Sequence, residues 1–222
     1  MKKSTVYLIL FFCIFVAGIN MEIINVQAQV IKEEQEERLI WFGDSRTVYF
    51  AKAVYGYNPK KGVSPATVLK KHVVARRGAT YTWANENGYK ELTERLKKRP
   101  NSTVIFNFGV NDIGRGYKHN LKYLNLIKKI HKKYPKAHIY FMSINPVKAS
   151  SKNPYAKTKR RAELLNKKIR TYNYYIRRHL PKGCKYINVN EKVKFQYVDG
   201  LHYKNKTYRD IAYYVTGERR LD

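Results

Sequence analysis

Three side chains in this sequence have the types that acyl transfer requires: a hydroxyl, an imidazole and a carboxylate. The hydroxyl is that of Ser45, which follows a short apolar segment in the run Trp41-Phe42-Gly43-Asp44-Ser45-Arg46-Thr47. A parallel sheet can present a hydroxyl in this way, at the carboxyl end of a strand. Ser45 is therefore a candidate nucleophile, although Gly-Asp-Ser is also an ordinary turn sequence.

A serine nucleophile needs a base, and His202 is the histidine that we place in a polar cluster beyond a predicted strand. Asp199 precedes it by three residues, so a tight Asp-Gly-Leu-His turn can bring the carboxylate to the imidazole Nδ1. An Asp-Gly turn with an exposed histidine is the alternative interpretation. The remaining histidines are expected to be solvated or structural: His72, His119, His131, His138 and His179.

The oxyanion of an acyl-transfer intermediate needs N–H donors. We nominate the backbone N–H groups of Ser45 and Gly78 and the side-chain amide of Asn111, since each residue follows a predicted strand. Asp44 and Asp112 are interpreted as residues that organise turns. Three arginines near these positions could contact an acidic substrate or only solvent, and we expect solvent: Arg46, Arg76 and Arg77.

The elements that must position these residues alternate along the chain. Short apolar runs predict strands at 39–42, 73–75, 103–108, 137–144 and 185–189. Helices are predicted at 47–54, 63–71, 86–98, 121–130, 158–180 and 208–215. This alternation predicts an α/β protein with a parallel sheet of about five strands and helices on both faces. The candidate residues, including the cluster at 198–203, would then meet at one edge of the sheet.

Four short motifs in this order resemble the sequence blocks of the SGNH hydrolases, also called the GDSL esterase/lipase family. They are Gly43-Asp44-Ser45, Gly78, Gly109-Val110-Asn111-Asp112 and Asp199-Gly200-Leu201-His202, and the resemblance covers about residues 38–216. Two features depart from it: Arg46 stands where many members have an apolar residue, and Gly78 lacks the asparagine often found before it.

The resemblance implies a flavodoxin-like three-layer fold over residues 38–222, a Ser-His-Asp mechanism without a metal, and ester substrates that range from lipids to acetylated sugars. We infer no cofactor, because the sequence contains neither a metal-ligand cluster nor a phosphate-binding glycine loop.

The first 28 residues have the pattern of a secretory signal peptide, with Lys2 and Lys3 before an apolar run and Val26-Gln27-Ala28 as a cleavage site. An uncleaved anchor is the alternative. Residues 29–37 are expected to form an acidic lead-in. Of the two cysteines, Cys13 would leave with the signal, so the mature chain has no internal disulfide, and Cys184 is interpreted as a buried strand residue.

The net charge of +29 must attract polyanions. An exported protein meets anionic envelope polymers first, and the absence of a nucleic-acid-binding motif argues against specific nucleic-acid binding. The favoured function is an exported serine esterase that removes a small acyl group, above all acetate, from an extracellular or envelope carbohydrate. The alternatives are a lipase or lysophospholipase, an O-acetyltransferase, and a non-catalytic module that binds wall polymer. Oligomeric state is not predicted.

Overall fold

The computed structural model describes residues 38–58, 65–114 and 117–217 of the 222-residue chain. Their elements belong to one compact unit, Leu39–Asp222. The expected signal segment 1–28 and the acidic lead-in 29–37 lie outside the described residues. Within the described ranges, none of the helices has the length and apolarity that a membrane span needs.

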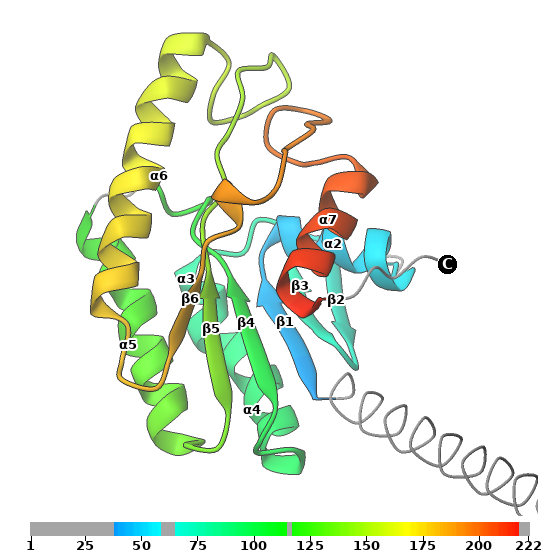
Figure 1. The fold of residues 1–222 in the computed structure, drawn as a ribbon, viewed down its shortest axis with the longest axis vertical. Coiled ribbons are helices and arrows are strands. Elements are labelled where there is room, and N and C mark those ends of the chain that lie inside the picture. Colours follow the sequence, from blue (N-terminus) through cyan, green and yellow to red (C-terminus); the bar gives the residue numbers. More distant parts are fainter. Residues whose placement is uncertain (1–37, 59–64, 115–116, 218–222) are drawn as a thin grey trace, which may run out of the picture. The chain divides into compact units, whose positions relative to one another are not determined.

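A central sheet organises this unit (Figure 1). In the described part it contains β1 (Leu39–Gly43), β2 (Thr67–Lys70), β3 (Val73–Arg76), β4 (Thr103–Asn107), β5 (His138–Met142) and β6 (Lys185–Ile187). The strand order is β2-β3-β1-β4-β5-β6, and all neighbouring pairs are parallel except β2 with β3. The predicted α/β class and parallel sheet are thus confirmed, with six strands in place of about five.

The extra strand, β2, lies within residues 63–71, where we expected a helix, so that prediction is wrong. Thr67–Lys70 pairs antiparallel with β3 across the turn at Lys71 and His72. This pairing satisfies the backbone groups of the segment that face β3, and Val68 is buried in the core between the sheet, α2 and α7. Pairing with the edge of the sheet therefore determines the conformation of this segment and outweighs its helix propensity.

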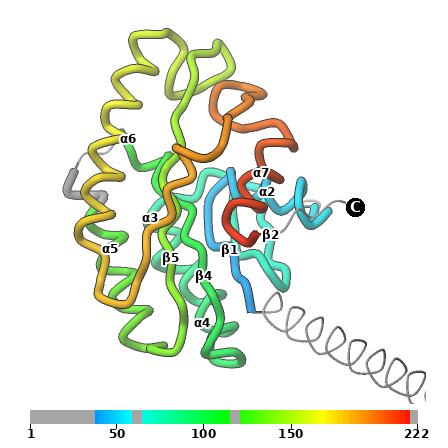
Figure 2. Tube along the Cα trace, in the orientation of Figure 1, coloured from blue at the N-terminus to red at the C-terminus, as the bar shows by residue number. Residues whose placement is uncertain are grey.

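Helices cover both faces of the sheet (Figures 1 and 2). The structure contains α2 (Ser45–Tyr55), α3 (Tyr81–Trp83), a π-helical turn (Ala84–Gly88), α4 (Tyr89–Lys98), α5 (Tyr117–Lys133), α6 (Lys159–His179) and α7 (Asn205–Thr216). Side chains of a strand point alternately to the two faces. In β1, Ile40 and Phe42 pack in the core with α4, α5 and α6, whereas Trp41 packs in the core with α2 and α7. The result is the expected three-layer arrangement.

The register of the sheet brings three strand ends level. Gly43 at the end of β1 lies opposite Ala75 of β3 and Asn107 of β4. Ser45, Gly78 and Asn111 therefore follow neighbouring, aligned positions, with β3 and β4 on opposite sides of β1. The fold therefore places these three residues close together at the carboxyl ends of the parallel strands.

Candidate active site

Ser45 lies at the first position of α2, directly after the turn that ends β1. Asp44 caps the helix, since its Oδ1 accepts the backbone N–H of Arg46 at 3.0 Å. A Cβ on Gly43 would overlap Thr47 Oγ1 and lie 2.7 Å from the carbonyl oxygen of Asn107. Only glycine thus lets β1, β4 and the start of α2 approach closely enough to place Ser45 at this point.

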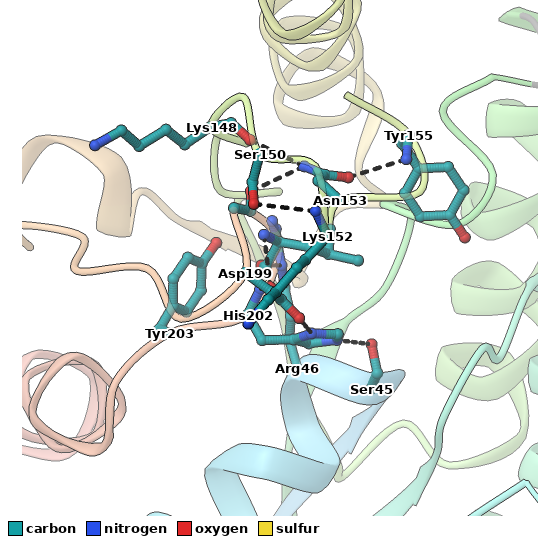
Figure 3. A network of polar contacts seen from close by, with 12 residues as sticks. Ser45, Arg46, Lys148, Ser150, Lys152, Asn153, Tyr155, Asp199, His202 and Tyr203 are labelled. Atoms are coloured by element: carbon teal, nitrogen blue, oxygen red, sulfur yellow. Dashed lines mark hydrogen bonds and ion pairs between the residues drawn. The ribbon is translucent and has the colours of Figure 1, made fainter. Parts of the chain in front are cut away.

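Ser45, His202 and Asp199 form a hydrogen-bonded chain (Figure 3). The distance from Ser45 Oγ to His202 Nε2 is 2.9 Å, and that from His202 Nδ1 to Asp199 Oδ2 is 2.7 Å. Because a carboxylate accepts the Nδ1 proton, the Nε2 lone pair is directed at the serine hydroxyl. The three residues nominated from the sequence are brought together as a chain of this kind requires.

The turn that carries Asp199 and His202 is held by its own backbone. Asp199 Oδ1 accepts the N–H groups of Leu201 at 2.9 Å and His202 at 2.7 Å. Gly200 has a φ of 82°, and a Cβ there would lie 2.9 Å from Ser150 Cβ. The turn needs glycine for both conformation and space, and it fixes the carboxylate against the imidazole.

The electrostatic surroundings keep His202 neutral and Asp199 ionised. Burial lowers the pKa of His202 below its ordinary value, and the hydrogen bond and charge of Asp199 oppose this shift only in part. Burial raises the pKa of Asp199, but hydrogen bonds from His202 and Leu201 outweigh it, so the pKa lies below its usual value. Burial also raises the pKa of Asp44 to about 7. A neutral imidazole beside an ionised carboxylate is the state that a general base needs.

The nominated oxyanion donors Asn111 and Gly78 lie on adjoining turns. Asn111 Nδ2 donates to the carbonyl oxygen of Ala79 at 2.8 Å, and its Oδ1 accepts the hydroxyl of Tyr155 at 3.0 Å. These two bonds fix the plane of the amide and leave its second N–H for another acceptor. Gly78 is exposed and has a φ of 67°, which glycine adopts without strain.

Asp112 has the turn-organising role that the sequence suggested. Its Oδ2 accepts the backbone N–H of Tyr81 at 3.0 Å and the hydroxyl of Tyr123 at 2.7 Å. The carboxylate thereby links the turn after β4 to the start of α3 and to α5. The neighbouring Asn111 is held in place through the same turn.

The expectation that the Arg46 side chain faces solvent is wrong. It is only 2% exposed, and it donates from Nε to the carbonyl oxygen of Leu201, from Nη1 to that of Asn145 and from Nη2 to that of Pro146, at 3.1, 2.8 and 3.2 Å. Its guanidinium carbon lies 5.0 Å from the centre of the Tyr203 ring. A planar guanidinium can satisfy several carbonyls at once, which is why a buried charge is tolerated here. Of the other two arginines, Arg77 is exposed and Arg76 is half-buried.

Three further residues support the site and carried no signal in the sequence. The Tyr49 ring lies 4.6 Å from the His202 ring, and Tyr155 bonds Asn111. Asn153 is buried and donates from Nδ2 to the carbonyl oxygens of Lys148 and Gly200, both at 3.0 Å (Figure 3). Apart from the bond between Asn153 and Lys148, which are five residues apart, these contacts join segments that are distant in the sequence, so no local motif marks these residues.

The remaining candidates lie away from this chain of hydrogen bonds. Cys184 immediately precedes β6, is half-buried, and has its pKa raised to about 11 by burial. His72 is buried, and its Nδ1 lies 3.2 Å from the carbonyl oxygen of Leu39. Among the described residues, no three His, Cys, Asp or Glu side chains come together as a metal site would require.

Comparison with known proteins identifies the class to which this fold and site belong. The sequence profile of the GDSL-like lipase/acylhydrolase family matches residues 41–209. The chain belongs to this family, as the four motifs suggested, and it is a serine ester hydrolase. A comparison with curated protein sequences finds no significant match.

Solved structures of esterases share the fold. A GDSL-like lipase from Bacteroides thetaiotaomicron is 15% identical with a TM-score of 0.54, over 83% of this chain and 88% of its own. A family 3 carbohydrate esterase from Clostridium thermocellum is 17% identical with a TM-score of 0.53, over 81% and 92%. A carbohydrate acetylesterase from Sinorhizobium meliloti is 14% identical with a TM-score of 0.50, over 80% and 95%. At these identities the likeness concerns the fold.

Proposed function

We propose that this esterase removes a small acyl group, above all acetate, from an extracellular or cell-envelope carbohydrate. In this proposal Ser45 is the nucleophile, His202 the base and Asp199 the residue that orients it. The observation that carries the assignment is the continuous pair of hydrogen bonds from Ser45 Oγ through His202 to Asp199. The fold shared with carbohydrate esterases supports the choice of substrate.

The proposed reaction has two stages. In the first, His202 Nε2 accepts the Ser45 proton while Oγ bonds to the acyl carbon, and the resulting oxyanion is stabilised by the N–H groups of Ser45 and Gly78 and the amide of Asn111. The imidazolium then protonates the departing sugar oxygen, which leaves an acyl-serine. In the second stage, water gives a proton to His202 and attacks this ester, and Ser45 recovers its proton as the acid departs.

We also propose that residues 1–28 direct export and that the basic surface holds the enzyme near anionic envelope polymers. The charge of +29 supports the second point. Expression of the full chain in a secreting host, followed by N-terminal sequencing of the extracellular protein, tests the first. A mature protein that begins near Gln29 is the expected result, and protein retained with its Met1 intact would contradict it.

The experiment that tests the catalytic assignment measures hydrolysis of para-nitrophenyl esters from acetate to octanoate. We expect acetate to be preferred, and Ser45→Ala and His202→Ala each to lower kcat by about 10³-fold or more. His138→Ala is the matched control, since this exposed histidine begins β5 at the amino ends of the parallel strands, whereas Ser45 lies at their carboxyl ends. Full activity in either active-site variant would refute the assignment, and a preference for octanoate would refute the short-acyl proposal.

A further inference from the structure

Two clefts lie beside the nominated oxyanion donors. The first, here called the glycine cleft, has a volume of about 400 Å³, and its lining includes Arg76, Arg77, Gly78, Trp83, Glu86 and Asn87. The second, here called the tyrosine cleft, has a volume of about 330 Å³ and is lined by Pro154, Tyr155, Lys157, Thr158 and Arg161. Each cleft can hold a sugar residue, and each has two cationic side chains in its wall.

The two clefts adjoin the loops that follow β3 and β4, the strands on either side of β1. Gly78 in the wall of the first follows β3, and the Tyr155 hydroxyl in the wall of the second bonds Asn111, which follows β4. Since β3 and β4 flank β1 in the sheet, we infer that a polymer with an ester at Ser45 can reach one cleft in each direction.

Arg77 is the cation that connects the glycine cleft to His202. This side chain is exposed, and its guanidinium carbon lies 5.7 Å from the centre of the Tyr49 ring, which in turn lies against His202. Glu86 also lines the cleft, so Arg76 and Arg77 leave it with one net positive charge. Asn87 and Trp83 add an amide and an aromatic ring, which are groups that commonly contact sugars.

The tyrosine cleft is more strongly positive, because no acidic side chain lines it. The backbone N–H of Arg161 donates to Thr158 Oγ1 at 3.2 Å, and its Nε donates to the carbonyl oxygen of Tyr155 at 3.4 Å. These bonds hold the side chain beside the cleft and do not use its Nη nitrogens. A guanidinium and an ammonium together suit a carboxylate or a phosphate.

We propose that the ester substrate is an acetylated polysaccharide that itself carries anionic groups, and that Arg77 on one side of Ser45 and Lys157 with Arg161 on the other bind those groups. This inference rests on the proposed esterase function and narrows its substrate class. It differs from simple attraction by the net charge, because charges near the ester must contact particular side chains. Carboxylates of uronic acids and phosphodiesters share the chemistry that these residues recognise.

The experiment uses two pairs of polymers that differ only in charge. Chemically acetylated polygalacturonate is compared with its methyl-esterified form, and acetylated phosphomannan with acetylated mannan, with acetate release as the readout. We expect kcat/KM for at least one anionic polymer to exceed that for its neutral partner by ~10-fold or more at low salt, and this ratio to approach one in 0.5 M NaCl because salt screens exposed charges. The pair that shows the preference distinguishes carboxylate from phosphate recognition.

Variants separate the clefts from the overall charge. Arg77→Gln and the double variant Lys157→Gln with Arg161→Gln should each lower the ratio ~3-fold or more, by raising KM on the anionic polymer. Arg178→Gln is the matched control for Arg77→Gln, and Arg177→Gln with Arg178→Gln is that for the double variant: they remove one and two charges from the last turn of α6, about 25 Å along the helix from Arg161. Both controls should leave the ratio unchanged.

Two results would overturn the inference. One is a ratio near one in both polymer pairs, and the other is an equal loss in the cleft variants and in their matched controls, which would mean that only net charge matters. Failure of the esterase proposal itself is recognised separately, as inactivity on para-nitrophenyl acetate. In that event, affinity electrophoresis of the Ser45→Ala protein through gels that contain polygalacturonate or phosphomannan still tests the clefts, since retardation must depend on Arg77 and Arg161 and not on Arg178.

Discussion

Arg46 is expected to be a positioning residue for His202, the proposed base, because it holds the segment that carries this histidine. Its Nε donates to the carbonyl oxygen of Leu201, the residue directly before His202, while its Nη nitrogens hold Asn145 and Pro146. The substitution Arg46→Met keeps the length and apolar contacts of the side chain but removes all three hydrogen bonds. The carbonyls of Leu201 and Asn145 then remain buried without this donor.

The size of the effect follows from these contacts. A buried acceptor that loses its partner costs about 1–3 kcal/mol, and the Pro146 carbonyl is less deeply buried, so we expect a loss of ~3–5 kcal/mol in the free energy of unfolding. For a chain of this size, that loss lowers Tm by about 10 °C. The ammonium of Lys cannot reach three oxygens as the planar guanidinium does, so Arg46→Lys should have an intermediate effect.

Kinetics distinguish positioning from a general loss of stability. A displacement of His202 by ~1 Å is enough to lower kcat by about 10²-fold, and the KM for para-nitrophenyl acetate should change little, because Arg46 does not face the substrate. The positive charge of Arg46 also contributes to lowering the pKa of His202. Its removal should therefore shift the midpoint of the pH–rate profile upward, which a purely structural role would not do.

Thermal unfolding by circular dichroism and steady-state kinetics below the melting temperature provide the assay. Lys52→Met, an exposed position on the same helix, is the control, and we expect its stability to change by no more than ~0.5 kcal/mol. An Arg46→Met protein with the Tm, kcat and pH profile of the wild type would refute the reasoning. A lower Tm with unchanged kcat would leave Arg46 a structural residue only.

Two other predictions concern pH and packing. The proposed base must be neutral, and burial lowers the pKa of His202, so kcat/KM should rise with pH through a midpoint below 6.5. Asp199→Asn removes the interactions that raise this pKa. Its midpoint should therefore lie lower than that of the wild type, and its rate should fall ~10³–10⁴-fold. An Asp199→Asn midpoint above that of the wild type would contradict the assigned electrostatics. Gly43→Ala should unfold at a markedly lower temperature, because the added Cβ overlaps Thr47. In the control Gly56→Ala, the added Cβ meets no atom within 4 Å but the φ of 65° is strained, so the free energy of unfolding should fall by only ~1 kcal/mol. Equal melting temperatures of the two variants would refute this account.

Much of the fold and of the candidate site could be predicted because their signals are local. The apolar run before Gly43 and the β-branched run at 103–107 mark buried parallel strands, and the polar residues after them mark the functional edge. Asp199 and His202 are close in sequence, so their contact follows from one turn. Asp44 and Asp112 organise turns as expected.

The features that could not be predicted depend on distant partners. The strand at Thr67–Lys70 is decided by pairing with β3, which no property of four residues specifies. Arg46 is buried because carbonyls from residues 145, 146 and 201 surround it, and a charged residue read alone is expected to face solvent. The role of Tyr155 depends on a hydrogen bond to a residue 44 positions earlier.

The two halves of the candidate site are therefore positioned by different means. Ser45, Gly78 and Asn111 follow adjacent strands whose register fixes them. His202 instead follows β6, which β4 and β5 separate from β1, so its segment must return across the edge of the sheet (Figure 2).

Hydrogen bonds to the segment after β5 hold this return in place. The Lys148 N–H and Asn153 Nδ2 both donate to the carbonyl oxygen of Gly200, and the Tyr203 hydroxyl donates to that of Pro146. Loops open locally at lower free energy than paired strands do. The position of His202, the proposed base, should accordingly be more sensitive to substitution at residues 145–153 than the position of Ser45, the proposed nucleophile.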